Sequence, residues 1–271
     1  MPELEVAGAT LYYETEGQVS HPALLLIHAG LASLRMWDPL VPELAVDHYV
    51  IRYDTRGYGS TVSTDAEYSN RADAIDLLDH LGILRATVIG CSRGGSIGID
   101  LALEHPDRIA GLVTVGSAPG GAPSPELNDR EHELFAAIGA AYDEGDLERA
   151  HDLEVEAWAF GPSRTVDDVA PAFARTAYDL HRSNLARAGE NPRAQPLDPP
   201  AYARLDELDL PVLVAVGELD IGPELVHFDH LISAIAGADD CRFADAGHLP
   251  SVEHPAEFEA VLRSWLAEKS L

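Results

Sequence analysis

One short segment of the chain places a serine between two glycines in a setting suited to nucleophilic catalysis. Residues 90–94, Gly-Cys-Ser-Arg-Gly, match the pattern G-x-S-x-G. The preceding residues 86–89 form an apolar, β-branched run typical of a buried parallel strand, and helical apolar spacing follows. A serine at the tip of such a sharp turn is crowded, so residues two positions away must lack bulk. Gly90 and Gly94 meet this need, and we predict that Ser92 is a nucleophile.

A glycine-rich turn with an incidental serine would have the same sequence, so the hypothesis needs a base and an acid elsewhere. A serine hydroxyl is a weak nucleophile until a base takes its proton, and a third group must hold that base in the correct tautomer. Asp220 follows an apolar strand pattern at 211–216, and His248 follows another at 241–244. Loops after the C-terminal ends of parallel strands converge on one crevice. We therefore predict that Ser92, Asp220 and His248 meet there.

The elements that must position these residues alternate between strands and helices. The apolar patterns predict strands at 4–14 (a pair around Gly8), 23–27, 48–54, 86–89, 109–115, 211–216 and 241–244. Helical spacing predicts helices at 33–44, with Ser33 as N-cap, at 72–81, after the serine turn, at 223–235 and at 256–266. Such alternation implies right-handed crossovers and a parallel sheet with helices on both faces.

The alternation stops after the strand at 109–115, and residues 126–183 show a purely helical pattern until the sheet resumes at 211–216. We therefore expect an α/β fold with a mostly parallel sheet and an inserted helical cap. The expected core comprises residues 1–118 and 208–271, and the expected cap, or lid, comprises residues 119–207.

These motifs resemble the α/β-hydrolase fold superfamily from end to end. Five ordered segments carry the resemblance: His28-Ala-Gly-Leu31, Asp54-Thr-Arg-Gly-Tyr-Gly59, Gly90-Cys-Ser-Arg-Gly-Gly95, Gly217-Glu-Leu-Asp220 and Gly247-His-Leu-Pro250. Ala29 stands where the superfamily usually has glycine, and Thr61 where it often has serine. The resemblance extends to small lidded bacterial hydrolases, including enol-lactonases of aromatic catabolism, and implies a Ser–His–Asp triad.

The acid has alternatives nearby, because Glu218 and Asp245 are close in sequence to the predicted triad positions. In some members of the superfamily the acid follows the strand after the nucleophile helix. Here that strand is followed by Gly-Ser-Ala-Pro, which has no carboxylate and favours Asp220. The order serine, acid, histidine is the one that accompanies this kind of serine turn.

The oxyanion hole should consist of two backbone amides. By the geometry of the turn one belongs to Arg93, directly after the nucleophile, and by resemblance the other belongs to Gly30. Each such donor stabilises charge that develops only in the transition state and is worth about 10²–10³ in rate. The residues that we expect around the substrate pocket are His28, Leu31, Trp158 and Phe160. We expect Asp54 and Arg56 to brace their loop as an ion pair.

The composition excludes several classes of function. The formal net charge is −28, with 46 acidic residues against 18 lysines and arginines, which argues against binding to nucleic acid or to an anionic membrane. The apolar run at 23–27 is too short to cross a bilayer, and residues 1–5 do not resemble a signal peptide. We therefore expect a cytoplasmic protein whose partner is a small-molecule substrate.

Cysteine and histidine usage points to no cofactor. Two cysteines make no disulfide framework, and Cys91 suits a core-filling thiol better than a nucleophile. His227 and His230 lie at i and i+3 of a predicted helix but lack further ligands, so we predict neither a metal nor any other cofactor.

We therefore expect a serine hydrolase that cleaves a small, neutral or weakly polar carboxylic ester or lactone through an acyl-enzyme. Two alternatives remain open. The same triad could cleave a carbon–carbon bond beside a ketone, or the fold could serve as a ligand receptor with slow or no turnover.

Overall fold

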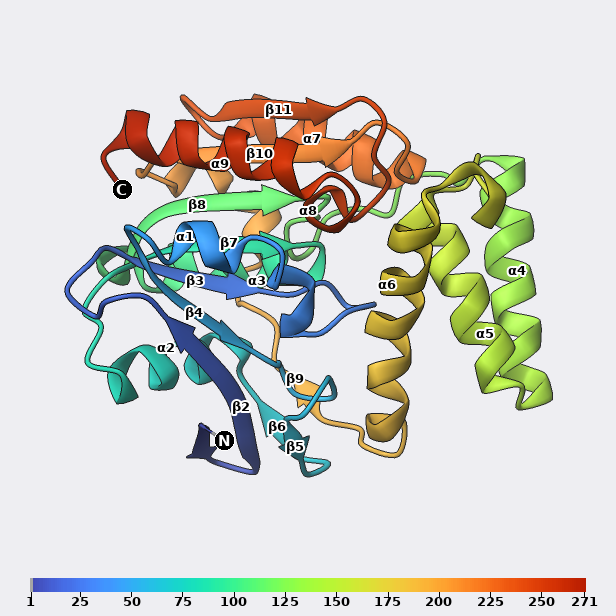
Figure 1. The fold of residues 1–271 in the computed structure, drawn as a ribbon, viewed down its shortest axis with the longest axis horizontal. Coiled ribbons are helices and arrows are strands. Elements are labelled where there is room, and N and C mark those ends of the chain that lie inside the picture. The colour runs from blue at the N-terminus through green and yellow to red at the C-terminus, as the bar shows by residue number, and fades with distance from the viewer. Residues whose placement is uncertain (1) are drawn as a thin grey trace.

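A mostly parallel β-sheet runs through the centre of the computed structural model, which describes residues 2–271 (Figure 1). Its path of strands, in spatial order, is β1 (Glu3–Val6), β2 (Ala9–Glu16), β4 (Tyr49–Tyr53), β3 (Ala23–Ile27), β7 (Ala86–Cys91), β8 (Ile109–Val115), β10 (Val212–Gly217) and β11 (Asp239–Phe243). The pairs β1–β2 and β2–β4 are antiparallel, and every later pair along this path is parallel. The short strand β5 (Val62–Ser63) pairs with β2. The α/β fold with a mostly parallel sheet is confirmed.

Both faces of this sheet are buried, which explains why its central strands are almost continuously apolar. Leu24 and Leu26 of β3 enter one core cluster, and Leu25 and Ile27 enter the other. The first cluster is covered by α1 (Val41–Leu44), α8 (Pro250–Glu253) and α9 (Pro255–Lys269), and the second by α2 (Asn70–His80), α3 (Arg93–Glu104) and α7 (Gly222–Ala234).

The helix expected over 33–44 and the strand expected over 241–244 differ from the structure in ways that have a physical reason. The helix expected over 33–44 is a 3₁₀ turn at Leu34–Trp37 followed by the short α1. Pro39 lies between them and has no N–H to continue a helix, although Ser33 does cap the turn by accepting from the Arg35 amide. The strand expected at 241–244 is β11, which begins at Asp239. Its residues alternate between more and less exposed positions, so no apolar run marks its start.

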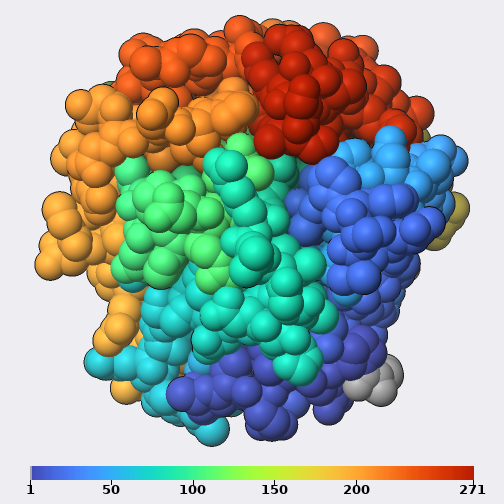
Figure 2. Space-filling model, turned by 90° about the vertical axis from the view of Figure 1, so that its left-hand side faces the viewer, coloured from blue at the N-terminus to red at the C-terminus, as the bar shows by residue number. Residues whose placement is uncertain are grey.

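Between β8 and β10 the chain leaves the sheet and forms three α-helices, which we call the cap helices. They are α4 (Asp129–Glu144), α5 (Leu147–Glu154) and α6 (Pro171–Arg182). They lie beyond the C-terminal ends of β3, β7 and β8 (Figure 1). In the view of Figure 2, core segments cover the surface and almost nothing of the cap helices is visible. We propose that residues 119–207 act as a cap over a core formed by residues 1–118 and 208–271.

Local sequence signals start and stop these helices. Asn128 accepts from the amide of Glu131, whose side chain accepts from the amide of Asn128, so that the two form a capping box at the start of α4. Gly145, with φ 75°, ends that helix in the left-handed conformation that glycine tolerates. Pro171 occupies the first position of α6, where its missing N–H costs nothing.

Several polar contacts join the inserted segment to the core. Asn184 donates to the carbonyl of Ala32 and accepts from the amide of Gly59. A two-stranded parallel sheet, β6 (Glu67–Tyr68) with β9 (Arg193–Ala194), attaches the end of the inserted segment. None of the helices described for residues 2–271 combines the length and the apolar character needed to span a bilayer.

Candidate active site

The serine turn lies between β7 and α3. Ser92 has φ 53° and ψ −119°, a left-handed conformation that costs a non-glycine residue about 1–3 kcal/mol. The turn is tight enough to exclude side chains on either side. A Cβ on Gly90 would lie 2.3 Å from the carbonyl carbon of Gly94, and a Cβ on Gly94 would lie 2.1 Å from the carbonyl oxygen of Ile27. The two glycines therefore permit the strained turn that presents the serine.

The predicted acid and base lie side by side. Asp220 follows β10 and His248 follows β11, and these neighbouring parallel strands end at the same edge of the sheet. The Nδ1 of His248 lies 2.7 Å from Oδ2 of Asp220, and both side chains are fully buried. A carboxylate only accepts hydrogen bonds, so Nδ1 carries the hydrogen and Nε2 is left as the basic nitrogen. The other carboxylate oxygen of Asp220 accepts from the Ile221 amide at 2.8 Å.

Ser92 and His248 face a common cavity of about 220 Å³. Its other lining residues are Gly30, Leu31, Glu154, Trp158 and His181. The Nε2 of His248 is buried and has no hydrogen-bond partner among residues 2–271. The basic nitrogen therefore makes no hydrogen bond to the described protein and lies at the cavity wall that also carries the serine.

The environment of His248 tunes its basicity. Burial alone would lower its pKa, but the charge and hydrogen bond of Asp220 and the charge of Glu224 outweigh burial and raise it. Trp158 packs on the imidazole with ring centroids 4.9 Å apart, and its carbonyl accepts from the His248 amide. A raised pKa favours the imidazolium that a general base forms during catalysis.

Glu224 is a third acidic side chain at this site, which the sequence analysis did not identify. It lies in the first turn of α7, and its Oε2 is buried without a partner in the described chain. Burial raises the pKa of Glu224 to about 7, with the negative charge of Asp220 adding to the rise and His248 opposing it. An acid in the first turn of a helix is common, so sequence alone does not distinguish it. The alternatives Glu218 and Asp245 are exposed, whereas Asp220 is buried.

The two predicted oxyanion donors are the backbone amides of Gly30 and Arg93. Gly30 lines the cavity beside Ser92. Arg93 is the first residue of α3, and the first amides of a helix have no partner within it. The neighbouring amide of Ala29 donates instead to the sulfur of Met36. We propose that the amides of Gly30 and Arg93 form the oxyanion hole.

Of the four predicted pocket residues, the structure brings two to the cavity. Leu31 and Trp158 line it, whereas Phe160 is fully buried and packs edge-on against Phe173 and Tyr178. Phe160 belongs to the π-helical turn Val155–Phe160, whose successive side chains point in different directions. Trp158 therefore lines the cavity, whereas Phe160 is part of the core.

His28 lies behind the cavity wall, not on it. Its ring is fully buried, Nε2 accepts from the Thr55 amide at 3.0 Å, and Nδ1 donates to the Ala29 carbonyl at 2.8 Å. Burial lowers its pKa to about 3, so the ring is neutral. It orders the loop that carries Gly30.

The expected ion pair between Asp54 and Arg56 was wrong. Asp54 accepts from the amides of Leu34 and Ser60. Arg56 pairs instead with Asp73 through two hydrogen bonds of 2.8 and 2.7 Å. Both residues do brace the loop, but with separate partners.

Two polar side chains from the cap helices complete the cavity wall, and the sequence analysis missed both. They are Glu154 of α5 and His181 of α6. Both also line a larger adjoining cavity of about 720 Å³, which shares Gly30 as well. They lie 27 residues apart in the chain, and only the packing of α5 against α6 brings them together.

The family follows from comparison with known proteins. A model of the alpha/beta hydrolase fold family matches residues 22–255. The chain belongs to that family. The resemblance predicted from the motifs is thereby confirmed, and this α/β-fold hydrolase acts on a small-molecule substrate.

Its relatives act on several kinds of substrate. A 2-hydroxymuconate semialdehyde hydrolase from a Pseudomonas species is 31% identical over 256 residues, covering 90% of this chain and 87% of that protein. The 3-oxoadipate enol-lactonase 2 of Acinetobacter baylyi is 26% identical over 277 residues, covering 96% of each chain. Among solved structures, the enol-lactonase from Burkholderia xenovorans is similar with a TM-score of 0.77 and 26% identity, covering 98% of this chain and 100% of that one.

Proposed function

We propose that this hydrolase cleaves a small carboxylic ester or lactone through an acyl-enzyme on Ser92. One observation carries the proposal. The partner-free Nε2 of His248 and the serine of the strained turn line the same cavity, while Asp220 holds the opposite ring nitrogen at 2.7 Å. This is the arrangement that a serine needs in order to lose its proton as it attacks a carbonyl carbon.

In the first half of the proposed reaction, the oxygen of Ser92 attacks the carbonyl carbon and its proton passes to Nε2 of His248. The carbonyl oxygen becomes an oxyanion, which the amides of Gly30 and Arg93 stabilise. His248 then protonates the leaving alkoxide, the carbon–oxygen bond breaks, and an acyl-serine remains. In a lactone the released hydroxyl stays attached to the acyl group.

In the second half, water takes the place of the alcohol. His248 removes a proton from the water as it attacks the acyl-serine carbonyl, and then returns that proton to the Ser92 oxygen as the ester bond breaks. The products are a carboxylate and the regenerated hydroxyl. Asp220 keeps the imidazole in one tautomer through both halves and stabilises its positive charge.

The size and lining of the cavity favour small substrates with an apolar part. Its volume of about 220 Å³ is below the usual range for drug-sized ligands. Leu31 and Trp158 supply apolar surface beside the nucleophile, and the acidic surface of a chain with net charge −28 repels polyanions. These features favour short, neutral or weakly polar acyl groups.

A second candidate is hydrolysis of a carbon–carbon bond beside a ketone, which would use the same three residues. The 31% identity to a semialdehyde hydrolase favours it. Under this alternative the protein would turn over vinylogous diketones rapidly and simple esters poorly. A ligand receptor with slow or no turnover is the third possibility.

Steady-state hydrolysis of short-chain p-nitrophenyl esters and of lactones tests the proposal. We expect multiple turnover by the wild type and a loss of about 10⁴–10⁶ in kcat for Ser92→Ala. Ser96→Ala is the matched control, because Ser96 lies one turn further along α3 and its hydroxyl donates to the Ala118 carbonyl. Rapid turnover of vinylogous diketones with little on esters would favour the second candidate, and no turnover of any substrate would favour the receptor.

A further inference from the structure

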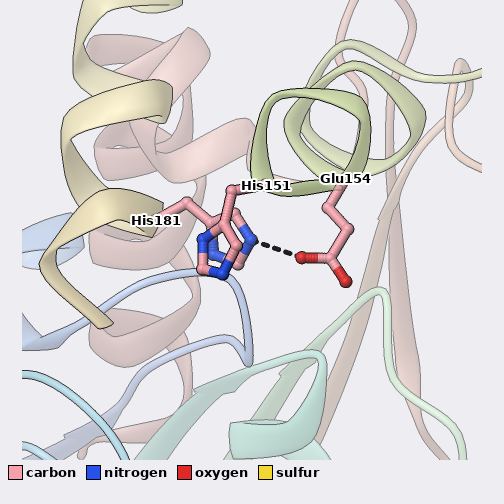
Figure 3. A group of neighbouring side chains, drawn as sticks. All are labelled: His151, Glu154 and His181. Carbon is pink, nitrogen blue, oxygen red and sulfur yellow. Dashed lines mark hydrogen bonds and ion pairs between the residues drawn. The ribbon is translucent and has the colours of Figure 1, made fainter. Parts of the chain in front are cut away.

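Three side chains with metal-binding chemistry meet where α5 packs against α6 (Figure 3). His151 and Glu154 lie at i and i+3 of α5, a spacing that places both on one face of a helix. His181 reaches them from the last turn of α6. One nitrogen or oxygen from each of the three lies within 4.8 Å of the others.

The hydrogen bonds within the protein do not satisfy this group. Nε2 of His181 lies 2.6 Å from a Glu154 oxygen, and the other oxygen of Glu154 accepts from the Tyr142 hydroxyl at 3.0 Å. The ring of His151 stacks on that of His181, with centroids 4.2 Å apart, and none of the hydrogen bonds found among residues 2–271 involves it. The residues His151 and His181 are 8% and 6% exposed, and the Nδ1 of each ring has no partner in the described chain.

An ion pair accounts for only part of the cluster. The contact between His181 and Glu154 explains those two side chains. It does not explain the second buried imidazole beside them, because the Nδ1 of His151 has no hydrogen-bond partner in the described chain. Burying an unpaired polar nitrogen costs about 1–3 kcal/mol, a cost that a ligand bound to these nitrogens would remove.

We propose that His151, Glu154 and His181 bind a divalent transition-metal ion, with Zn²⁺ as the best match. Two imidazoles and one carboxylate form the donor set that Zn²⁺ takes in open, three-ligand sites, where a fourth position remains for water or substrate. Hard ions such as Mg²⁺ prefer oxygen ligands and suit this set poorly.

Metal binding requires one local movement. An ion about 2.0–2.1 Å from each ligand brings the ligand atoms to roughly 3.3 Å apart. A metal also lies in the plane of each imidazole that binds it, so two stacked rings cannot share one ion. The ring of His151 must therefore turn about its side-chain bonds. All three residues line the 720 Å³ cavity, which provides both the space and the entry path.

The ion would have two consequences. It would join α5 to α6, and it would place a positive charge with an open coordination position on a wall shared with Ser92 and His248, since Glu154 and His181 line both cavities. The site does not depend on the proposed ester or lactone hydrolysis, and its test needs no turnover.

Titration of chelator-treated, full-length protein with Co²⁺, followed by displacement with Zn²⁺, tests the site. We expect one ion per chain, visible cobalt absorption bands that disappear on adding Zn²⁺, and a rise in Tm with Zn²⁺. His151→Ala and His181→Ala should each weaken binding at least about 100-fold. Glu154→Gln preserves the side-chain shape and should also weaken binding, which serves the test if a histidine variant does not fold.

His230→Ala is the matched control. His227 and His230 are two histidines at i and i+3 of α7, and they could bind metal without any contribution from the cap helices. We expect this variant to bind Co²⁺ as tightly as the wild type. Absence of cobalt bands in the wild type, binding undiminished in both His151→Ala and His181→Ala, or loss of binding in His230→Ala would each overturn the proposal.

Discussion

Replacing Glu224 with glutamine tests the electrostatics behind the triad. The carboxylate lies in the first turn of α7, and one of its oxygens is buried with no partner in the described chain. Burial raises its pKa from 4.5 to about 7. Between these two pH values the unfolded chain ionises this side chain while the folded protein keeps it protonated.

The size of the effect follows from that difference in pKa. Below about pH 4.5 the Glu224 side chain is protonated in both the folded and the unfolded protein, so it does not change the free energy of unfolding with pH. Stability then falls by about 1.4 kcal/mol per pH unit until the folded group ionises near pH 7, for a total of about 3 kcal/mol. Glutamine has no charge to bury. The stability of Glu224→Gln relative to wild type should therefore rise by about 2.5 kcal/mol from pH 5 to pH 8.

Urea unfolding of both proteins at pH 5, 6, 7 and 8 measures this gain. Glu218→Gln is the matched control, because its carboxylate is exposed in the adjacent loop. Above about pH 7, where Glu224 is ionised, its negative charge also raises the pKa of His248, and the substitution removes that contribution. A stability difference that stays constant from pH 5 to pH 8 would refute the reasoning.

Three further substitutions probe the scaffold. Asp220→Asn should lower kcat by about 10⁴ with little change in KM, since the histidine loses its tautomer; a loss below tenfold would mean that Glu224 serves as the acid. Gly94→Ala should cost about 3 kcal/mol in urea unfolding and most of the activity, because its Cβ meets the Ile27 carbonyl oxygen at 2.1 Å; an unaffected protein would contradict the tight turn. Arg164 pairs with Glu253, whose carboxylate also accepts from the Gly247 amide beside His248. Arg164→Ala should therefore lower stability by about 2 kcal/mol and reduce kcat, and an unchanged kcat would separate this pair from the histidine loop.

The sequence predicted the sheet, and it suggested the three residues of the proposed triad, because both rest on local patterns. Buried parallel strands need continuous apolar runs, and such runs precede Ser92 and Asp220. His248 follows the edge strand β11, whose residues alternate in exposure, and was placed by the short pattern at 241–244. Ser92 was recognisable from its glycines, since their small size is a requirement of the turn itself.

The remaining site residues depend on packing that no local pattern encodes. Glu154 and His181 meet only because α5 and α6 lie together, and Glu224 is buried only because α7 covers the acid loop. The sequence predicted His28 as a pocket residue, but its hydrogen bonds to the backbone of Ala29 and Thr55 hold its ring behind the cavity wall. Arg56 pairs with Asp73, 17 residues further along the chain, because α2 packs beside the loop that carries Arg56.

The central claim is that His248 activates Ser92 at the cavity wall, and covalent labelling tests it most directly. Wild-type protein and Ser92→Ala, both shown to be folded by circular dichroism, are treated with a fluorophosphonate, and intact mass is followed by peptide mapping. The account predicts a single adduct on the peptide that contains Ser92 in the wild type and none in the variant. A folded wild type that stays unmodified, or an adduct on another residue that persists in the variant, would contradict it.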